Sequence, residues 1–143
     1  MSQKPSSPPT TVTGSCLCQA VKYTVSGSPR GTVLCHCSNC QKTTGSAFAN
    51  NLRVLKSKLT ILSGEDKIKC HKDSNTKSGI ELSRYFCGDC GSPVYLTNPE
   101  FQGLVVLYTG CIDTDAKHER PRGEMFGENT RKWFAGVEGA SKL

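Results

Sequence analysis

The segment Cys35-His36-Cys37-Ser38-Asn39-Cys40, CHCSNC, places three thiols within six residues. We refer to Cys35, Cys37 and Cys40 as the three-cysteine cluster. Zinc that is held by three protein ligands keeps one coordination position open, which is the arrangement of a catalytic site. Three thiolates make such a centre anionic and soft, so that a thiol is a natural fourth ligand. The segment therefore predicts a catalytic zinc ion with an open position for a substrate.

Two further pairs of cysteines stand about 70 residues apart in the chain, and we refer to Cys16, Cys18, Cys87 and Cys90 as the four-cysteine cluster. Residues i and i+2 of a strand point to the same face, so Cys16 and Cys18 can reach one ion. Cys87 and Cys90 flank a tight turn in which glycines let the backbone fold around a metal. Four thiolates make the closed tetrahedral set of a structural zinc.

Other readings of these cysteines remain open at the level of the sequence. Either Cys70 or Cys111 could complete the three-cysteine cluster and close it. The four-cysteine cluster could consist of buried thiols that only pack together. Cys87-x-x-Cys90 could be a redox motif, but that motif belongs to a βαβ context, which the pattern does not show.

Composition limits the class of protein. The chain has 143 residues, nine cysteines and a formal charge of +6, and 36% of its residues are hydrophobic. An odd number of closely spaced cysteines argues against a disulfide framework. Binding of two zinc ions by seven thiolates would reduce the charge to about +3. We therefore predict no nucleic-acid partner and, since no apolar run is long enough to span a bilayer, no membrane partner.

The pattern along the chain is typical of a mainly β fold made of short antiparallel strands. Residues 1–13 are predicted to be a disordered leader, 14–135 a zinc domain and 136–143 a flexible tail, with Trp133-Phe134 as the packing anchor of the C-terminal part. One helical turn is expected at Ser38 to Thr43, with Ser38 as its N-cap. Strands are expected at Val21 to Val25, Thr32 to Leu34, Ala47 to Leu55, Leu59 to Leu62, Lys67 to His71, Ile80 to Phe86, Pro93 to Thr97 and Leu104 to Thr109.

The order of the motifs resembles one known family. Gly14-Ser15-Cys16-Leu17-Cys18, then CHCSNC with Thr44-Gly45-Ser46, then Phe86-Cys87-Gly88-Asp89-Cys90-Gly91 are similar to the glutathione-dependent formaldehyde-activating enzyme family, also called the centromere protein V-like domain. The likeness extends from Gly14 to Trp133. It implies a small zinc-containing β-tent with two zinc ions per chain, structural in the four-cysteine cluster and catalytic in the three-cysteine cluster.

The resemblance also implies carbon–sulfur lyase chemistry. The family's prototype joins glutathione and formaldehyde, so glutathione or a similar thiol is the expected co-substrate, with an aldehyde or related electrophile as its partner. His36, which strand alternation turns away from the ligands, is expected to support the zinc site without ligating it. Ser46 and Glu124 are further pocket candidates, and Glu124 stands where family members often carry a histidine. That departure puts formaldehyde as the substrate in doubt.

The chain ends with Ser141-Lys142-Leu143, and a C-terminal SKL is the address read by the peroxisomal import receptor. We therefore expect location in the peroxisome matrix, and otherwise in the cytoplasm. Two other functions stay open beside the enzyme. The first is a binding or scaffold protein in which zinc only stabilises a β-tent. The second, a chromatin or cytoskeleton binder, fits the weak net charge least well.

Overall fold

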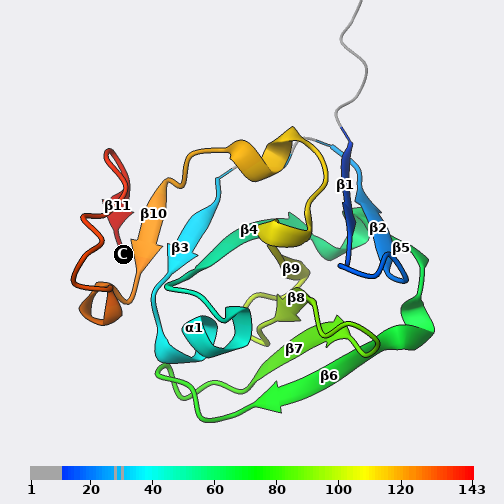
Figure 1. The fold of residues 1–143 in the computed structure, drawn as a ribbon, viewed down its shortest axis with the longest axis horizontal. Coiled ribbons are helices and arrows are strands. Elements are labelled where there is room, and N and C mark those ends of the chain that lie inside the picture. Colours follow the sequence, from blue (N-terminus) through cyan, green and yellow to red (C-terminus); the bar gives the residue numbers. More distant parts are fainter. Residues whose placement is uncertain (1–10, 28, 30) are drawn as a thin grey trace, which may run out of the picture.

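The computed structural model describes residues 11–27, 29 and 31–143, and within them the chain forms two sheets (Figure 1). The smaller sheet has the antiparallel order β1-β2-β5. Its strands are β1 (Val12–Ser15), β2 (Lys22–Val25) and β5 (Leu59–Ser63). This sheet stands at one end of the molecule, opposite the end that carries β10 and β11 (Figure 1).

The larger sheet has eight strands in the order β11-β10-β3-β4-β9-β8-β7-β6. Its neighbours are antiparallel, except that β10 runs parallel to both β3 and β11. The strands are β3 (Val33–Cys35), β4 (Ala49–Leu55), β6 (Ile68–Asp73), β7 (Leu82–Cys87), β8 (Pro93–Thr97), β9 (Leu104–Tyr108), β10 (Gly123–Met125) and β11 (Ser141–Lys142).

Helical structure in the described residues is short. The α-helix α1 (Ser38–Thr44) follows β3 directly and ends at Gly45, which adopts the left-handed conformation at φ 63°. The 3₁₀ turns are η1 (Lys56–Lys58), η2 (Glu65–Lys67), η3 (Thr109–Cys111), η4 (Asp115–His118) and η5 (Gly127–Asn129). Among these described residues, no helix combines the length and the apolar character that crossing a bilayer requires.

The main core lies between the two sheets. Tyr23 of the smaller sheet and Leu52 and Leu107 of the larger one are at most 1% exposed and belong to one packed cluster. Because side chains alternate along a strand, Asn51 and Arg53 of β4 face the opposite side of the larger sheet from Leu52. The functional cavity described below lies on that side.

The mainly β class with short antiparallel strands is confirmed, and the predicted strands from Val21 to Thr109 correspond to β2 to β9. Two details differ from the predictions. The N-cap of α1 is Cys37, whose sulfur accepts a hydrogen bond from the Cys40 N–H at 3.3 Å, so the assignment of Ser38 as the N-cap was wrong. Trp133 is 74% exposed, and only its neighbour Phe134 packs inward, against His36 and Phe48.

The two ends of the predicted domain are placed as follows. Residues 1–10 of the predicted leader lie outside the described residues, and β1 begins at Val12. The predicted tail contains β11, in which the Ser141 N–H donates to the Arg122 carbonyl and the Leu143 N–H to the Glu124 carbonyl, each at 2.8 Å. Gly123 suits this contact, because a Cβ there would lie 2.7 Å from Cδ1 of Leu143.

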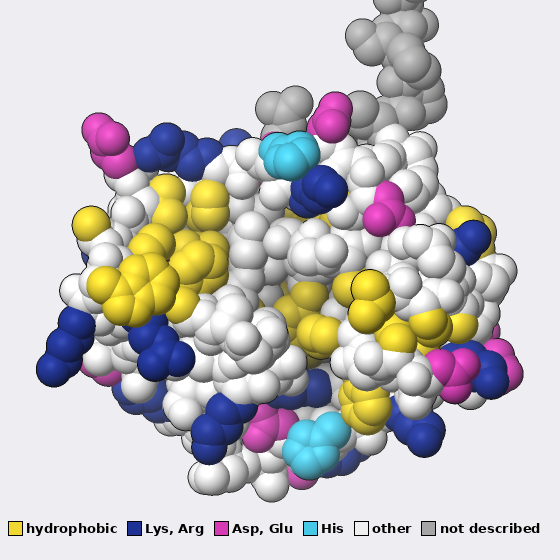
Figure 2. Space-filling model, in the orientation of Figure 1, with side chains coloured by type: hydrophobic (Ala, Val, Ile, Leu, Met, Phe, Trp, Pro, Cys, Tyr) yellow, Lys and Arg dark blue, Asp and Glu magenta, His cyan; other side chains and the backbone are white. Residues whose placement is uncertain are grey.

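The surface seen in Figure 2 carries Lys and Arg side chains along its rim, with Asp and Glu side chains between them. A group of hydrophobic side chains is exposed on the left of this view, over the C-terminal part of the chain (Figures 1 and 2). The exposed side chains of Trp133 and Leu143 belong to that part.

Candidate functional site

The four-cysteine cluster joins the two sheets. Cys16 and Cys18 lie in the turn after β1, Cys87 ends β7 and Cys90 lies in the turn before β8. All four sulfur atoms lie within 4.8 Å of one another, with 3.6 Å between Cys16 and Cys18 and 3.8 Å between Cys18 and Cys87. A tetrahedron with Zn–S bonds of about 2.3 Å has sulfur–sulfur edges of about 3.8 Å. The residues present therefore fit a closed tetrahedral metal site.

The local backbone of this cluster differs from the predicted one. Cys16 and Cys18 are not on a strand, so the argument from a shared strand face was wrong. They meet because the chain turns back after β1: the Gln19 N–H donates to the Cys16 carbonyl at 3.0 Å and the Val21 N–H to the Cys16 sulfur at 3.2 Å. Hydrogen bonds from backbone N–H groups to sulfur are typical of thiolates that hold a metal.

The three-cysteine cluster forms at the junction of β3 and α1. Cys35 is the last residue of β3, Cys37 caps α1, and Cys40 lies in the first turn of that helix. Their sulfur atoms lie within 4.8 Å of one another. The two sulfurs of the helix, at i and i+3, share one side of α1, and the end of the strand brings the third to them.

The charge state of the bare thiols fits a cation site. The hydrogen bond from Cys35 lowers the pKa of the Cys37 thiol to about 2. The same hydrogen bond to Cys37 raises the pKa of Cys35 far above its usual range. One thiolate is thus stabilised by protonated neighbours, and three thiolates together require a cation. Sulfur donors in this number suit zinc.

Arg84 of β7 adds a buried positive charge beside the cluster. Its Nη1 lies 3.9 Å from the Cys40 sulfur and donates to the Tyr108 hydroxyl at 2.8 Å, and its Nε donates to Asp73 at 2.7 Å. Burial lowers the pKa of Arg84, but its interactions with Tyr108 and Asp73 outweigh this effect and raise the pKa. The sequence analysis missed Arg84, although a charged residue in the middle of a predicted strand was a usable signal.

His36 and Glu124 form a buried pair on another side of the cysteines. The His36 side chain is 1% exposed and its Nε2 lies 2.9 Å from Oε1 of Glu124. Oε2 of Glu124 pairs with the ammonium of Lys142 and accepts from the Val137 N–H at 3.2 Å. The His36 backbone N–H also donates to the Met125 carbonyl, at 3.1 Å. His36 therefore anchors the backbone between Cys35 and Cys37.

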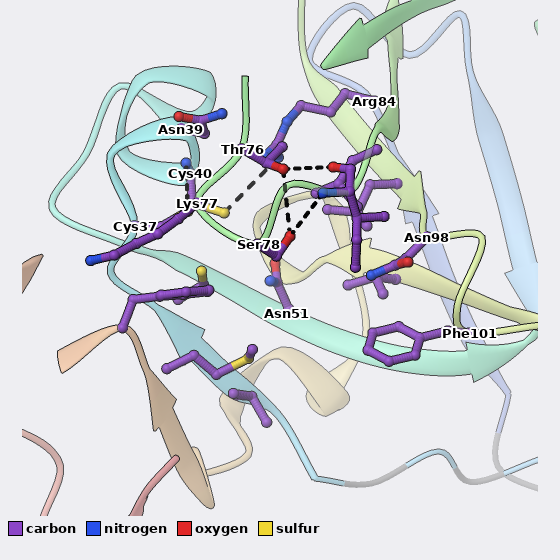
Figure 3. Close-up of a pocket in the computed structure, with 18 of the residues that line it drawn as sticks. Cys37, Asn39, Cys40, Asn51, Thr76, Lys77, Ser78, Arg84, Asn98 and Phe101 are labelled. Atoms are coloured by element: carbon purple, nitrogen blue, oxygen red, sulfur yellow. Dashed lines mark hydrogen bonds between the residues drawn. The ribbon is translucent and has the colours of Figure 1, made fainter. Parts of the chain in front are cut away.

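A cavity of about 230 Å³ opens beside the three-cysteine cluster, on the face of the larger sheet that points away from the main core (Figure 3). All three cysteines line it, as do Asn51 and Arg84. Thr76 and Ser78, from the loop between β6 and β7, border it on one side and are hydrogen-bonded to each other (Figure 3). The open position predicted for the metal site thus faces a space that can hold a small molecule.

Asn51 was not anticipated from the sequence. It lies in the cavity wall (Figure 3), and its buried Oδ1 has no hydrogen-bond partner among the described residues. An unpaired buried acceptor costs free energy, which a bound ligand with a suitable donor would recover. Asparagine in a polar-looking stretch carries no sequence signal for this role.

The remaining candidates lie elsewhere. Neither Ser46 nor Glu124 belongs to the residues that line the cavity, and the Ser46 hydroxyl donates to the Phe48 carbonyl at 2.7 Å. Cys70 is exposed on β6, and the Cys111 thiol donates to the Pro93 carbonyl at 3.3 Å. The structure brings neither of these two thiols into the three-cysteine cluster.

Comparison with known proteins agrees with this geometry. The model of the family described as glutathione-dependent formaldehyde-activating enzyme matches residues 11–129. A protein of Halomonas elongata, provisionally named as such an enzyme, is 32% identical over 124 residues, which cover 84% of this chain and 77% of the relative. The crystal structure of a Rhodobacter sphaeroides protein shares the fold, with a TM-score of 0.57 at 18% identity over 71% of this chain and 87% of that one. The chain therefore belongs to the glutathione-dependent formaldehyde-activating enzyme family.

Proposed function

We propose that this protein is a zinc-dependent carbon–sulfur lyase that makes or breaks adducts between glutathione, or another small thiol, and an aldehyde. In the forward direction the sulfur of the thiol forms a bond to the carbonyl carbon, and the thiol proton ends on the carbonyl oxygen as a hydroxyl group. The reverse reaction returns both partners. No oxidant or reductant is needed, because both electrons of the new bond come from sulfur.

One observation carries this proposal: the two cysteine clusters differ in what surrounds them. The four-cysteine cluster already offers four sulfur ligands within 4.8 Å. The three-cysteine cluster offers three, and all three line a cavity. A metal centre with an incomplete ligand set beside a cavity is the arrangement expected for catalysis, whereas a purely structural site has no need of the cavity.

Each group in the cavity has a part in this chemistry. A zinc ion held by Cys35, Cys37 and Cys40 would supply a Lewis acid that favours the thiolate form of a substrate thiol. Arg84 offsets the negative charge that gathers at the cysteines. The Oδ1 of Asn51 is positioned to accept a hydrogen bond from the hydroxyl of the adduct, and apolar walls keep competing water away from it.

The name of the Halomonas elongata relative states dependence on glutathione and activation of formaldehyde. We extend only the general chemistry, thiol plus aldehyde, to this chain. Which thiol and which aldehyde this protein prefers can be measured directly. Adducts of different thiols and aldehydes form spontaneously in water, so each can be tested in turn as a substrate.

The experiment measures zinc content and the exchange of substrate in the same samples. We expect about two zinc ions per chain in the wild type and about one in Cys37→Ala. Cys70→Ala is the matched control, since this exposed thiol belongs to neither cluster. Exchange among a thiol, formaldehyde and their adduct is followed by NMR at equilibrium, with glutathione and with the neutral thiol 6-mercaptohexanol in turn. With at least one of the two thiols it should be faster with wild type and Cys70→Ala but not with Cys37→Ala.

Two results would contradict the proposal. Exchange rates that do not respond to wild-type protein at full zinc content, with either thiol, would exclude catalysis of this reaction and favour the scaffold alternative. Equal exchange by Cys37→Ala and the wild type would exclude the three-cysteine cluster as the reacting site. Circular dichroism of each variant distinguishes a lost site from a lost fold.

We also propose that Ser141-Lys142-Leu143 directs the protein to the peroxisome matrix through the import receptor. A fluorescent protein that carries residues 131–143 at its C-terminus should accumulate in peroxisomes, and the same fusion with Leu143 deleted should stay in the cytoplasm. Identical distribution of the two fusions would remove the proposal.

A further inference from the structure

The walls of the cavity are mostly hydrocarbon. Residues of six strands of the larger sheet, β3, β4, β7, β8, β9 and β10, and of the adjoining segments line it from one face of that sheet. The apolar side chains that define its middle are Ile80, Leu82, Leu96, Val106, Met125 and Phe126. Ile80, Leu82, Met125 and Phe126 are only partly buried, so a ligand that covered them would remove further apolar surface from water.

The charged groups of the cavity do not favour an anionic ligand. Arg84 is engaged by Asp73, and Lys77 pairs with Glu128 and donates to Asn129 at 2.9 Å. At the mouth, Arg53 lies over the Phe101 ring, and Glu100 lines the same opening. One positive and one negative group at the rim leave no surplus of positive charge. Glutathione carries two carboxylates and one ammonium group, so this cavity matches it poorly.

We infer that the thiol taken by this site carries a hydrocarbon group next to its sulfur, and the inference rests on the function proposed above. A cavity of about 230 Å³ has room for a thiol with a short hydrocarbon chain. The apolar walls select the hydrocarbon group of the substrate thiol, and the sulfur of that thiol lies at the three-cysteine cluster.

The test is a series of neutral thiols that differ only in the length of the carbon chain: 2-mercaptoethanol, 4-mercaptobutanol and 6-mercaptohexanol, with glutathione for comparison. Binding to the zinc-loaded, full-length protein is measured by calorimetry. Because each methylene group leaves water as the chain grows, we expect Kd to fall at least tenfold from the shortest thiol to the longest. Glutathione is expected to bind more weakly than 6-mercaptohexanol.

A variant that fills the cavity identifies the place of binding. Val106→Phe adds a ring in the middle of the cavity, and it should abolish the dependence of Kd on chain length while 2-mercaptoethanol binds within about threefold of its wild-type Kd. Leu62→Phe is the matched control, since Leu62 is 61% exposed in the smaller sheet. If Val106→Phe loses its zinc or its fold, Ile80→Phe in the loop between β6 and β7 takes its place.

The outcomes separate the inference from the proposed function. Equal Kd values along the series, or glutathione as the tightest ligand, would overturn the inference and leave the lyase intact. The inference would also be overturned if Val106→Phe and Leu62→Phe weakened the dependence of Kd on chain length to the same extent. If no thiol binds to protein that holds two zinc ions, the proposed function fails, and the inference fails with it.

Discussion

Asn50 and Asn51 are adjacent residues of β4 whose side chains lie on opposite faces of the larger sheet. Both carry a buried Oδ1 with no hydrogen-bond partner among the described residues, and they lie next to each other in β4. Alternation turns Asn51 toward the cavity and Asn50 toward the opposite face of the sheet. The two side chains are chemically identical, but only Asn51 lies in the cavity wall, where a ligand can reach it.

Asn51→Leu is expected to lower kcat/KM for the thiol–aldehyde reaction about tenfold, the usual effect of one lost hydrogen bond in a buried site. Its zinc content should stay that of the wild type. Asn50→Leu serves as the control, with kcat/KM unchanged after correction for folded protein. Equal losses of kcat/KM in the two variants would show that the effect comes from the strand and not from the substrate.

Glu124 connects stability to pH. Burial raises the pKa of its carboxyl group, but the hydrogen bonds from Lys142 and His36 outweigh burial and lower the pKa to about 2, below the ordinary value of 4.5. A carboxyl group with a lowered pKa in the folded state stabilises the fold above its pKa in the unfolded chain, and this contribution disappears as the pH falls toward the folded value.

We therefore expect Glu124→Gln to have a lower free energy of unfolding than the wild type at pH 7. The difference between them should shrink as the pH is lowered from about 5. Urea denaturation of both proteins over this range measures the difference. Glu81→Gln is the control at an exposed position. A difference that is constant from pH 7 to pH 3 would contradict the role of the ionised carboxylate.

At the scale of elements, the loop between β6 and β7 covers the cavity. It is fixed to the rest of the molecule at two places. Nδ2 of Asn39 in α1 donates to the Asn75 carbonyl at 2.8 Å, and Lys77 pairs with Glu128 of η5. The second contact joins exposed groups, so it contributes little free energy and can open readily.

Lys77→Ala should therefore increase amide hydrogen exchange in residues 74–81 by about two- to fivefold, the range expected for loss of one exposed ion pair. Lys67→Ala removes a similar exposed pair, with Asp89, far from the cavity and is the matched control. Exchange measured by mass spectrometry resolves the two segments. Protection of residues 74–81 that is the same in both variants would show that Lys77 does not hold the loop.

The sequence predicted those elements whose signal lies within a few consecutive residues. Cysteine spacing indicated both clusters, and alternation indicated β2 to β9. β1, β10 and β11 were missed, because strands of two to four residues have almost no period of their own, and the first two residues of β1, Val12 and Thr13, lie in the predicted leader. The last two strands exist because long-range contacts bring Gly123 of β10 beside β3 and Ser141 of β11 beside Gly123.

The cavity could not be predicted for a related reason. Its walls come from strands that are distant in sequence, and the order β3-β4-β9-β8-β7 decides which side chains face one another. The partners of Arg84 follow from the same order, because Asp73, Cys40 and Tyr108 lie on separate elements. A single sequence reports the period of each strand but not its neighbours.

At the scale of the whole molecule, the two cysteine clusters connect segments that lie at different separations along the chain. The four-cysteine cluster ties the turn after β1 to the turn between β7 and β8, and so links the two sheets. The three-cysteine cluster joins β3 to the helix that follows it directly. A metal that closes a long loop restricts the unfolded chain more than one that closes a short loop.

Cys90→Ala is therefore expected to lower the melting temperature much more than Cys37→Ala, by at least about 10 °C. Differential scanning calorimetry of the zinc-loaded variants gives both values under one condition. Equal melting temperatures, with the expected zinc content in each variant, would show that the two sites contribute alike to stability.

The pairing of β11 with β10 has a consequence for recognition. Ser141 and Leu143 use their backbone N–H groups in the sheet, and Lys142 uses its ammonium on Glu124. Under the targeting proposed above, an import receptor that reads these three residues would compete with the protein's own sheet for the same hydrogen bonds. Only molecules whose last strand has separated would then be bound, and the apparent affinity would fall in proportion to their fraction. The buried carboxylate of Glu124 would thus limit how often the address can be read.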